Sequence, residues 1–369
     1  MPSMLFSECT MRGLTLPNRI VVSPMGQYSA SPEGHATEWH LMHLGHLAVS
    51  GAGLLITEAT AVHPNGRISR YDLGLWSDAH AAALEPAIAF CRKYGGARLG
   101  MQLHHAGRKG SCTVAWERQR PVVPAEGGWT IYAPSALAYP GRSTPEALTV
   151  EAIASTVRDF AAAAERADRL GLDLLELHAA HGYLIHSFLS PLANRRDDEY
   201  GGGLDRRMRF MLDVFDAIRS GWPDRKPLGV RISASDWADG GWTIDDSVVL
   251  ARRLRERGCD FITASSGGAV PEQKLEVHPG YQVPFAERIR REAAIPTMAV
   301  GLITEPRQAE EILASEKADL VALARGMLYD PRWPWHAAME MGDPVFYPPQ
   351  YERAHPSMRA GDFLKPARD

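Results

Sequence analysis

Apolar residues in this chain gather in short runs, each followed by a segment with helical spacing. Runs in which polar and apolar residues do not alternate are typical of strands buried on both faces. The pattern predicts eight strands, at residues 19–25, 53–59, 98–103, 172–178, 227–233, 260–265, 296–301 and 319–324. The clearest helix is predicted at residues 150–170, with Thr149 as its N-cap and Gly171 ending it.

Eight strands that alternate with helices indicate an α/β fold with one (β/α)8 TIM barrel rather than two doubly wound domains. No predicted strand is followed by the G-x-G-x-x-G turn of a dinucleotide-binding fold. We expect the barrel to occupy residues 1–345 and a C-terminal tail to occupy residues 346–369. Residues 108–148 are rich in Pro and Gly and should form a capping loop after the third strand, with Trp116, Trp129 and Tyr132 packed rather than exposed.

Polar and small residues stand where the predicted strands end, which is where barrel enzymes carry their catalytic groups. They are Ser23, Pro24, Met25, Gly26, Ala59, Gln102, His178, Arg231, Ser265, Gly301, Ala324 and Arg325. Each one alone has an ordinary structural explanation, such as a hydrogen bond to the backbone. Together they predict a binding site at the barrel mouth.

Two histidines three residues apart, His178 and His181, precede Tyr183 in this region. Two ring N–H groups side by side can bind one carbonyl or phenolate oxygen, and Tyr183 is then a candidate proton donor. The same pair could instead bind a metal ion, but a metal site needs a third ligand, and Glu176 is expected to point away from the two rings. A metal-dependent lyase or hydrolase that uses His178 and His181 therefore stays as the alternative.

The last two strands suggest a phosphate site, because barrels commonly hold a phosphate after strands seven and eight. Gly301 and the pair Ala324 and Arg325 stand at these positions. Backbone N–H groups at a helix start and one arginine would neutralise the phosphate. Gln102 and Arg231 could then face a flat ring, which predicts flavin mononucleotide (FMN), with Arg231 stabilising negative charge on the reduced ring.

Composition and charge limit the kinds of binding partner and cofactor that we expect. The net charge of −4 is small and its charges are scattered, which argues against nucleic acid, and no apolar run approaches the roughly 20 residues of a membrane span. The N-terminus lacks a basic segment before an apolar one, so we expect a cytoplasmic protein. The four cysteines form no Cys-x-x-Cys pair, and we predict no metal cofactor.

Ordered motifs along almost the whole chain resemble the old yellow enzymes, specifically their thermophilic-like branch (class III). The matching segments are 17–20 (PNRI), 23–25 (SPM), 51–54 (GAGL), 58–59 (EA), 105–109 (HAGRK), 178–184 (HAAHGYL), 188–191 (FLSP), 198–202 (DEYGG), 231–233 (RIS), 299–303 (AVGLI) and 350–353 (QYER). The resemblance implies an FMN-dependent ene-reductase, or NADPH dehydrogenase, with tightly but non-covalently bound FMN and with NADPH preferred over NADH.

The resemblance also implies a ping-pong reaction in which hydride passes through flavin N5 to the β-carbon of an α,β-unsaturated carbonyl or nitro compound. His178 and His181 would hold the substrate oxygen, and Tyr183 would protonate the α-carbon. Residues 23–26, Ala59, Gln102, Arg231, Gly301 and 324–325 look like the flavin site. Tyr28 and Arg353 resemble further substrate contacts, Arg353 being supplied by a neighbouring subunit, which implies a homodimer or homotetramer.

Two positions depart from the family pattern. Gly26 stands where most members of this branch have a cysteine beside the flavin, so we expect a changed flavin potential and room for bulkier substrates. Ala324 stands where glycine usually precedes the arginine, and its methyl group is tolerable if the φ angle is negative. Residues 355–369 lie beyond the motifs and show no clear period.

Overall fold

The barrel predicted from the sequence is present in the computed structural model, which describes residues 3–354. Its eight parallel strands are β3 (Ile20–Val22), β4 (Leu54–Ala61), β5 (Arg98–His104), β8 (Leu174–Ala179), β9 (Leu228–Ser233), β10 (Phe261–Ser265), β11 (Thr297–Ala299) and β12 (Leu320–Leu323). They pair in chain order, and β12 closes the ring by pairing with β3. All eight predicted strands are confirmed, although the first and seventh end earlier because residues 23–26 and 300–301 already belong to loops at the mouth.

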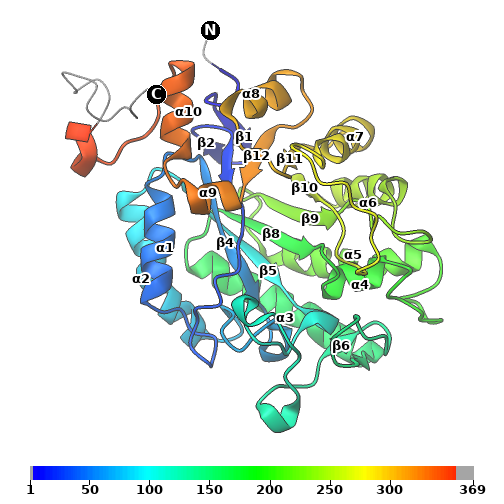
Figure 1. Ribbon diagram of the computed structural model, residues 1–369. Helices are drawn as coiled ribbons and strands as arrows, with labels where there is room; N and C mark the ends of the chain where they lie inside the picture. The colour runs from blue at the N-terminus through cyan, green and yellow to red at the C-terminus, as the bar shows by residue number, and fades with distance from the viewer. Residues whose placement is uncertain (1–2, 355–369) are drawn as a thin grey trace.

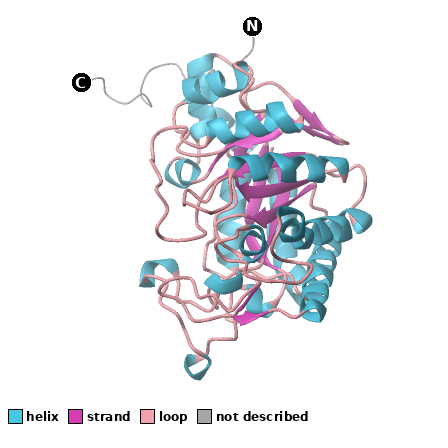
Figure 2. Ribbon diagram, turned by 90° about the vertical axis from the view of Figure 1, so that its right-hand side faces the viewer, coloured by secondary structure: helices cyan, strands magenta, loops and turns pink. Residues whose placement is uncertain are grey.

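Helices surround the strands on the outside of the barrel (Figures 1 and 2). They are α1 (Glu38–Ala48), α2 (Asp78–Tyr94), α3 (Val150–Arg169), α4 (Leu184–Leu189), α5 (Leu204–Gly221), α6 (Ile244–Glu256), α7 (Val283–Ala293), α8 (Pro306–Ala314), α9 (Arg325–Tyr329) and α10 (Trp333–Met341). The expected helix at 150–170 is confirmed as α3. The Thr149 side chain caps it by accepting from the Ala152 N–H at 3.2 Å, and Gly171 follows its last turn with φ +79°.

Two apolar layers hold the barrel together. The larger one lies between strands and helices, and a smaller one fills the barrel interior. The hairpin of β1 (Cys9–Met11) and β2 (Leu14–Leu16) packs on this inner layer near the first residues of the strands, such as Leu54, and so closes the end opposite the mouth. Gly229 leaves space for Phe261 in the interior, because a Cβ atom there would lie 2.3 Å from the phenylalanine ring.

The capping loop at 108–148 contains the short strand β6 (Tyr132–Ala133), which pairs with β7 (Glu146–Ala147), and the 3-10 turns η2 (Gly107–Lys109), η3 (Ala115–Glu117) and η4 (Pro124–Glu126). Trp129 is packed as expected: its Nε1 donates to Asn65 O at 3.2 Å, and the Arg67 guanidinium lies 4.8 Å from its ring centre. The expectation for Trp116 is wrong, since it is 69% exposed. Its ring makes an edge-on contact with Tyr28, with 6.0 Å between the ring centres, and this single contact leaves most of the ring facing solvent.

No helix within residues 3–354 is long and apolar enough to cross a membrane. Whether the protein is cytoplasmic stays a prediction. The segment after α10 ends in the 3-10 helix η5 (Pro349–Ala354), and the tail at 355–369 that the sequence left uninterpreted lies outside the described residues.

Candidate active site

A cavity of about 400 Å³ opens where the carboxyl ends of the barrel strands meet. Predicted site residues line it: Ser23, His181, Arg231, Gly301, Ala324 and Arg325. Its wall also contains residues that the strand-end pattern did not indicate, from the loops after β10 and β11: Gln273, Tyr281, Gln282 and Leu302. The cavity lies within the size range of small-molecule sites, which is roughly 300–1,000 Å³.

One end of the cavity is suited to a phosphate. Gly301 follows β11 with φ +109°, a conformation that favours glycine, and a Cβ atom there would lie 2.8 Å from Gln282 Oε1. Ala324 precedes α9 with φ −108°, so its methyl group is tolerated, as expected. The first N–H groups of α9 have no acceptor inside the helix, and Arg325 adds a positive charge beside them.

Two charged side chains lie inside the barrel beside the cavity, a half-buried arginine and a fully buried glutamate. Arg231 on β9 donates to Ser23 Oγ at 3.2 Å, while Glu176 on β8 accepts from Gln102 Nε2 and Thr263 Oγ1, both at 3.3 Å. Burial raises the pKa of Glu176 and lowers that of Arg231, and the attraction between the two charges opposes both shifts.

The expectation that Glu176 points away from the site is wrong. Glu176 and His178 are two residues apart on one strand, so their side chains lie on the same face, and the Glu176 carboxylate lies inside the barrel. Gln102 and Thr263 hydrogen-bond both of its oxygens there. Among residues 3–354, no group of three or more His, Cys, Asp or Glu side chains is arranged to hold a metal ion.

The two predicted histidines face each other, with 3.3 Å between His178 Nε2 and His181 Nδ1. His178 is the last but one residue of β8, and its Nδ1 accepts from the Ala180 N–H at 3.2 Å. His181 follows with φ +60°, held there by its own N–H, which donates to Ser233 Oγ at 2.9 Å. Burial lowers the pKa of both rings well below the usual 6.5, so both are neutral near pH 7.

Tyr183 packs edge-on against His104 and His178, with ring centres 4.4 and 4.9 Å apart. Burial raises its pKa, and the nearby Tyr28 hydroxyl raises it further, so the Tyr183 hydroxyl keeps its proton across the physiological pH range. Histidines and tyrosine therefore come together as the sequence predicted.

The capping loop holds Tyr28 in place. Gln119 Nε2 donates to the Tyr28 hydroxyl at 3.2 Å, and Arg142 Nη2 donates to Gln119 Oε1 at 3.0 Å. Tyr28 itself has φ +51°, which is uncommon outside glycine. Because the phenol oxygen already accepts from Gln119, its hydrogen is available to a ligand at the mouth. Burial raises the pKa of Tyr28 to about 12, so this hydrogen is retained.

A lysine that the sequence analysis did not single out joins two of these loops. Lys109 Nζ donates to His181 O at 2.7 Å and to Gly268 O at 2.6 Å, and burial lowers its pKa to about 7. The loops touch closely, since a Cβ atom on Gly182 would lie 2.1 Å from Gly268 O. In the sequence, Lys109 stands out only as the last residue of the HAGRK motif. The partners of its side chain are backbone atoms, which no sequence pattern reveals.

The remaining predicted flavin residues follow strand β3 or lie near the end of β4, across the mouth from the loops after β8 and β10. Pro24 and Met25 are half-buried, whereas Gly26 is exposed. A bulge in β4 places Glu58 toward α1, where its Oε1 lies 3.2 Å from His40 Nε2 and its Oε2 accepts from the Gln27 N–H at 2.8 Å. The carboxylate therefore fixes the loop after β3, and half-buried Ala59 follows it.

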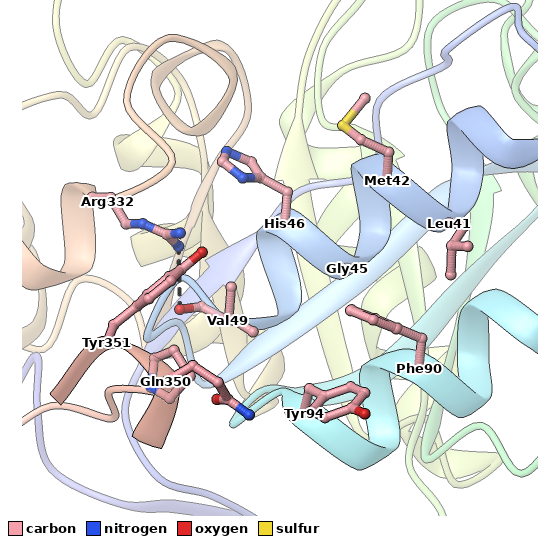
Figure 3. A pocket seen from close by; sticks show the side chains of 11 residues that line it. Leu41, Met42, Gly45, His46, Val49, Phe90, Tyr94, Arg332, Gln350 and Tyr351 are labelled. Carbon is pink, nitrogen blue, oxygen red and sulfur yellow. Dashed lines mark hydrogen bonds between the residues drawn. The ribbon is translucent and has the colours of Figure 1, made fainter.

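Arg353 lies elsewhere. The segment η5 lies across a pocket of about 550 Å³ from α1 and α2, and its Gln350 and Tyr351 help line that pocket (Figure 3). Arg332 lines one side of this pocket: it donates to Val49 O at 3.3 Å, and its guanidinium lies 5.5 Å from the Tyr351 ring centre. Arg353 is exposed on this segment and does not line the strand-end cavity.

The buried histidines predict a loss of stability in acid. Burial lowers the pKa of His178 and His181, that of His43 to about 4, and those of His104 and His105 to about 3. All titrate near 6.5 when unfolded, so below that pH the unfolded chain binds more protons. The free energy of unfolding should fall from about pH 6.5 toward pH 4, by up to about 1.4 kcal/mol per pH unit for each histidine.

Buried carboxyls work against this trend, and Asp72 and Glu176 are two of them. Burial raises the pKa of Asp72 to about 6, so its stabilising contribution grows as pH falls from about 6 to 4 and offsets about one histidine. Urea unfolding at a series of pH values measures the slope, and His43→Gln, outside the site, should reduce it by about one proton. A free energy of unfolding that stays constant between pH 7 and 4.5 would contradict the assignment of neutral buried histidines.

Comparison with known proteins supports a flavin enzyme. Residues 4–343 match the sequence profile of the NADH:flavin oxidoreductase / NADH oxidase family. The chain is 49% identical over 355 residues to the NADPH dehydrogenase of Geobacillus thermodenitrificans, covering 96% of this chain and 99% of that protein.

Solved structures agree with the sequence relatives. Morphinone reductase superposes with a TM-score of 0.77 at 27% identity, covering 94% of this chain and 91% of its own. The old yellow enzyme homologue from Zymomonas mobilis superposes with a TM-score of 0.75 at 25% identity, covering 94% of both chains.

Proposed function

Because this chain belongs to the NADH:flavin oxidoreductase / NADH oxidase family and is an FMN-dependent NADPH oxidoreductase of the old yellow enzyme type, we propose that it reduces activated C=C bonds. The substrates are α,β-unsaturated carbonyl or nitro compounds, and NADPH is preferred over NADH. The observation that carries the proposal is the pair of facing ring nitrogens of His178 and His181, 3.3 Å apart beside Tyr183.

The residues of the strand-end cavity fit FMN. Arg231 is half-buried in the cavity wall, and its buried Nε has no hydrogen-bond partner within the part of the chain that the structure describes, so it is available to a polar ring atom. We assign the ring to Gln102, Arg231, Ala59 and residues 23–26, and the phosphate to Gly301, Ala324 and Arg325. Bound FMN supplies the hydride chemistry, accepting hydride from NADPH and giving it to the alkene.

The neutral histidines hold the substrate oxygen. A carbonyl or nitro oxygen between His178 and His181 gains negative charge when hydride reaches the β-carbon, and positioned N–H donors stabilise that charge. Their low pKa values matter here, because a charged imidazolium pair would repel itself in a buried site.

Tyr183 then provides the proton for the α-carbon. Its raised pKa keeps the hydroxyl protonated until a basic carbon forms. His104 and His178 pack against its ring edge-on and fix its orientation. Tyr28, held by Gln119, provides a further donor to a substrate in this pocket.

Product analysis with 2-methylcyclohexenone tests the reaction. With NADPH carrying deuterium at the transferred position, the product ketone should carry deuterium at the β-carbon only. In deuterated water it should instead carry deuterium at the α-carbon, on the opposite face. Formation of the allylic alcohol, or a product without deuterium from NADPH, would contradict the proposal.

Gly26 should decide how large a substrate fits. A Cβ atom there would lie 3.6 Å from the Tyr28 ring, which is ordinary contact, so Gly26→Cys should fold normally. The added side chain fills the space beside Tyr28, so kcat/KM for β-substituted, bulky enones should fall about tenfold, and the flavin potential should change.

Gly26→Ala is the matched control, because it adds volume without a thiol. It should narrow the substrate range but leave the flavin potential close to that of the wild type. If Gly26→Cys changes neither potential nor range, the assignment of residue 26 to the flavin and substrate pocket is wrong.

We also propose that the chain works as a homodimer or homotetramer in the cytoplasm, with the barrel at 1–345 and the tail at 346–369. Exposed Arg353 on η5, outside its own cavity, supports its reaching a neighbouring subunit's site. A monomer in analytical ultracentrifugation that is fully active would contradict this.

A further inference from the structure

Two side chains behind the histidine pair bear on which protons the pair carries. On the far side of the ring from His178, His181 Nε2 lies 2.7 Å from Ser265 Oγ, at the end of β10. The amide of Gln282, just before α7, donates its two hydrogens to Ser265 Oγ at 3.2 Å and to Ser266 Oγ at 2.8 Å. Ser265 and Gln282 are both buried.

The proton on His178 is fixed by the backbone. Its Nδ1 accepts from the Ala180 N–H, so the neutral ring carries its hydrogen on Nε2, facing His181. That hydrogen is the first donor of the pair. Whether the pair has a second donor depends on His181 alone.

His181 can carry its hydrogen on either nitrogen. With the hydrogen on Nε2, His181 donates to Ser265, and its Nδ1 accepts from His178, so the two rings bind each other and offer no second donor. With the hydrogen on Nδ1, the two nitrogens 3.3 Å apart are both donors, so they repel each other unless an acceptor oxygen at the mouth bridges them.

Gln282 favours the second arrangement. The Ser265 oxygen already accepts from the Gln282 amide, so a His181 Nε2–H would make it a double acceptor and leave its own O–H hydrogen without an acceptor among the side chains of residues 3–354. If Ser265 instead donates to His181 Nε2, every hydrogen in the chain from Gln282 to Ser265 to His181 is satisfied. An unsatisfied buried hydroxyl costs enough to shift such an equilibrium strongly.

We propose that Ser265 and Gln282 are positioning residues that hold His181 with its hydrogen on Nδ1, so that the histidine pair selects oxygens that only accept hydrogen bonds. Carbonyl, nitro and phenolate oxygens belong to this class, whereas a hydroxyl oxygen brings a hydrogen that neither nitrogen can accept. The inference rests on the proposed role of His178 and His181 in binding substrate oxygen.

Nitrogen-15 NMR of histidine-labelled, FMN-loaded enzyme tests the inference. The ligand is a phenol with a pKa below the working pH, so that it binds as the phenolate. Wild-type His181 should show a protonated Nδ1. Ser265→Ala should move the hydrogen to Nε2, and Ser265→Thr, which keeps the hydroxyl, should restore it. Ser266→Ala removes the other hydroxyl bound by Gln282 and should leave the His181 tautomer unchanged.

Affinity provides a readout that simple loss of packing would not produce. In Ser265→Ala the phenolate should bind about 10- to 100-fold more weakly, because one donor has become an acceptor. A phenol that stays neutral should lose much less, since its O–H can donate to the free Nδ1. Should Ser265→Ala fold poorly, Gln282→Met offers the same test with a smaller shift.

The outcomes separate the inference from the function it rests on. The inference is wrong if wild-type enzyme binds the phenolate while His181 carries its hydrogen on Nε2, or if Ser265→Ala weakens the binding of phenol and phenolate equally. In either case the proposal that His178 and His181 bind the substrate oxygen is unaffected. If FMN-loaded wild-type enzyme binds neither ligand, the proposal that His178 and His181 bind the substrate oxygen is itself wrong.

Discussion

Replacing both His178 and His181 with alanine should abolish phenolate binding and lower kcat/KM for cyclohexenone by at least about 10⁴-fold, while FMN stays bound. Removing one donor from an oxyanion site typically costs about 10²- to 10³-fold, and here both donors disappear. The cofactor should remain, because Arg231, Gly301 and Arg325 stay in the cavity wall when His181 is truncated, and Arg231 is held by Ser23 rather than by either ring. Spectral titration with phenolate and steady-state kinetics measure the two effects.

His336→Ala is the control for this variant, because His336 is exposed and pairs with Asp330 away from the mouth. Its kinetics and phenolate affinity should match the wild type. Thermal melting should show that the double variant is still folded. A double variant that still binds phenolate with unchanged affinity would place the oxygen site elsewhere in the barrel.

Tyr183→Phe should lower kcat for enone reduction by about 10²- to 10⁴-fold, because the phenol hydrogen is the proton for the α-carbon. Phenylalanine keeps the edge-on contacts with His104 and His178, so the fold and phenolate binding should persist. Reduction of the flavin by NADPH should be nearly unchanged. Stopped-flow measurement of the two half-reactions separates these effects.

The type of substrate sharpens this prediction. A nitro group holds negative charge well enough for water to protonate the carbon later, so nitroalkenes should lose less activity than enones. Tyr28→Phe is the matched control: it removes the other phenol hydroxyl at the mouth, the one bound by Gln119, and its effect should be small by comparison. Equal, small losses in both variants would remove Tyr183 from the role of proton donor.

The barrel and much of its mouth were predictable because strand ends are local features of the sequence. Arg231, Gly301 and Ala324 each follow an apolar run, and parallel strands bring such positions to one end of the barrel. The spacing of His178, His181 and Tyr183 on one strand and the loop that follows it likewise limits how far apart their rings can lie.

Contacts between loops were not predictable in this way. Gln282 reaches Ser265 and Gln119 reaches Tyr28 through loop conformations set by backbone hydrogen bonds, and nothing in the sequence marks these glutamines. Glu176 differs from its expected orientation for another reason: residues two apart on a strand share a face, so Glu176 lies on the same side of β8 as His178. The residue type of Trp116 favours burial, but its edge contact with one tyrosine leaves its ring largely exposed.

The visible spectrum of the purified protein through one catalytic cycle tests the central claim most directly. NADPH added without oxygen should bleach the yellow flavin absorbance, and cyclohexenone added next should restore it in full. Bleaching that a large excess of enones and nitroalkenes does not reverse would contradict the assignment as a reductase of activated C=C bonds.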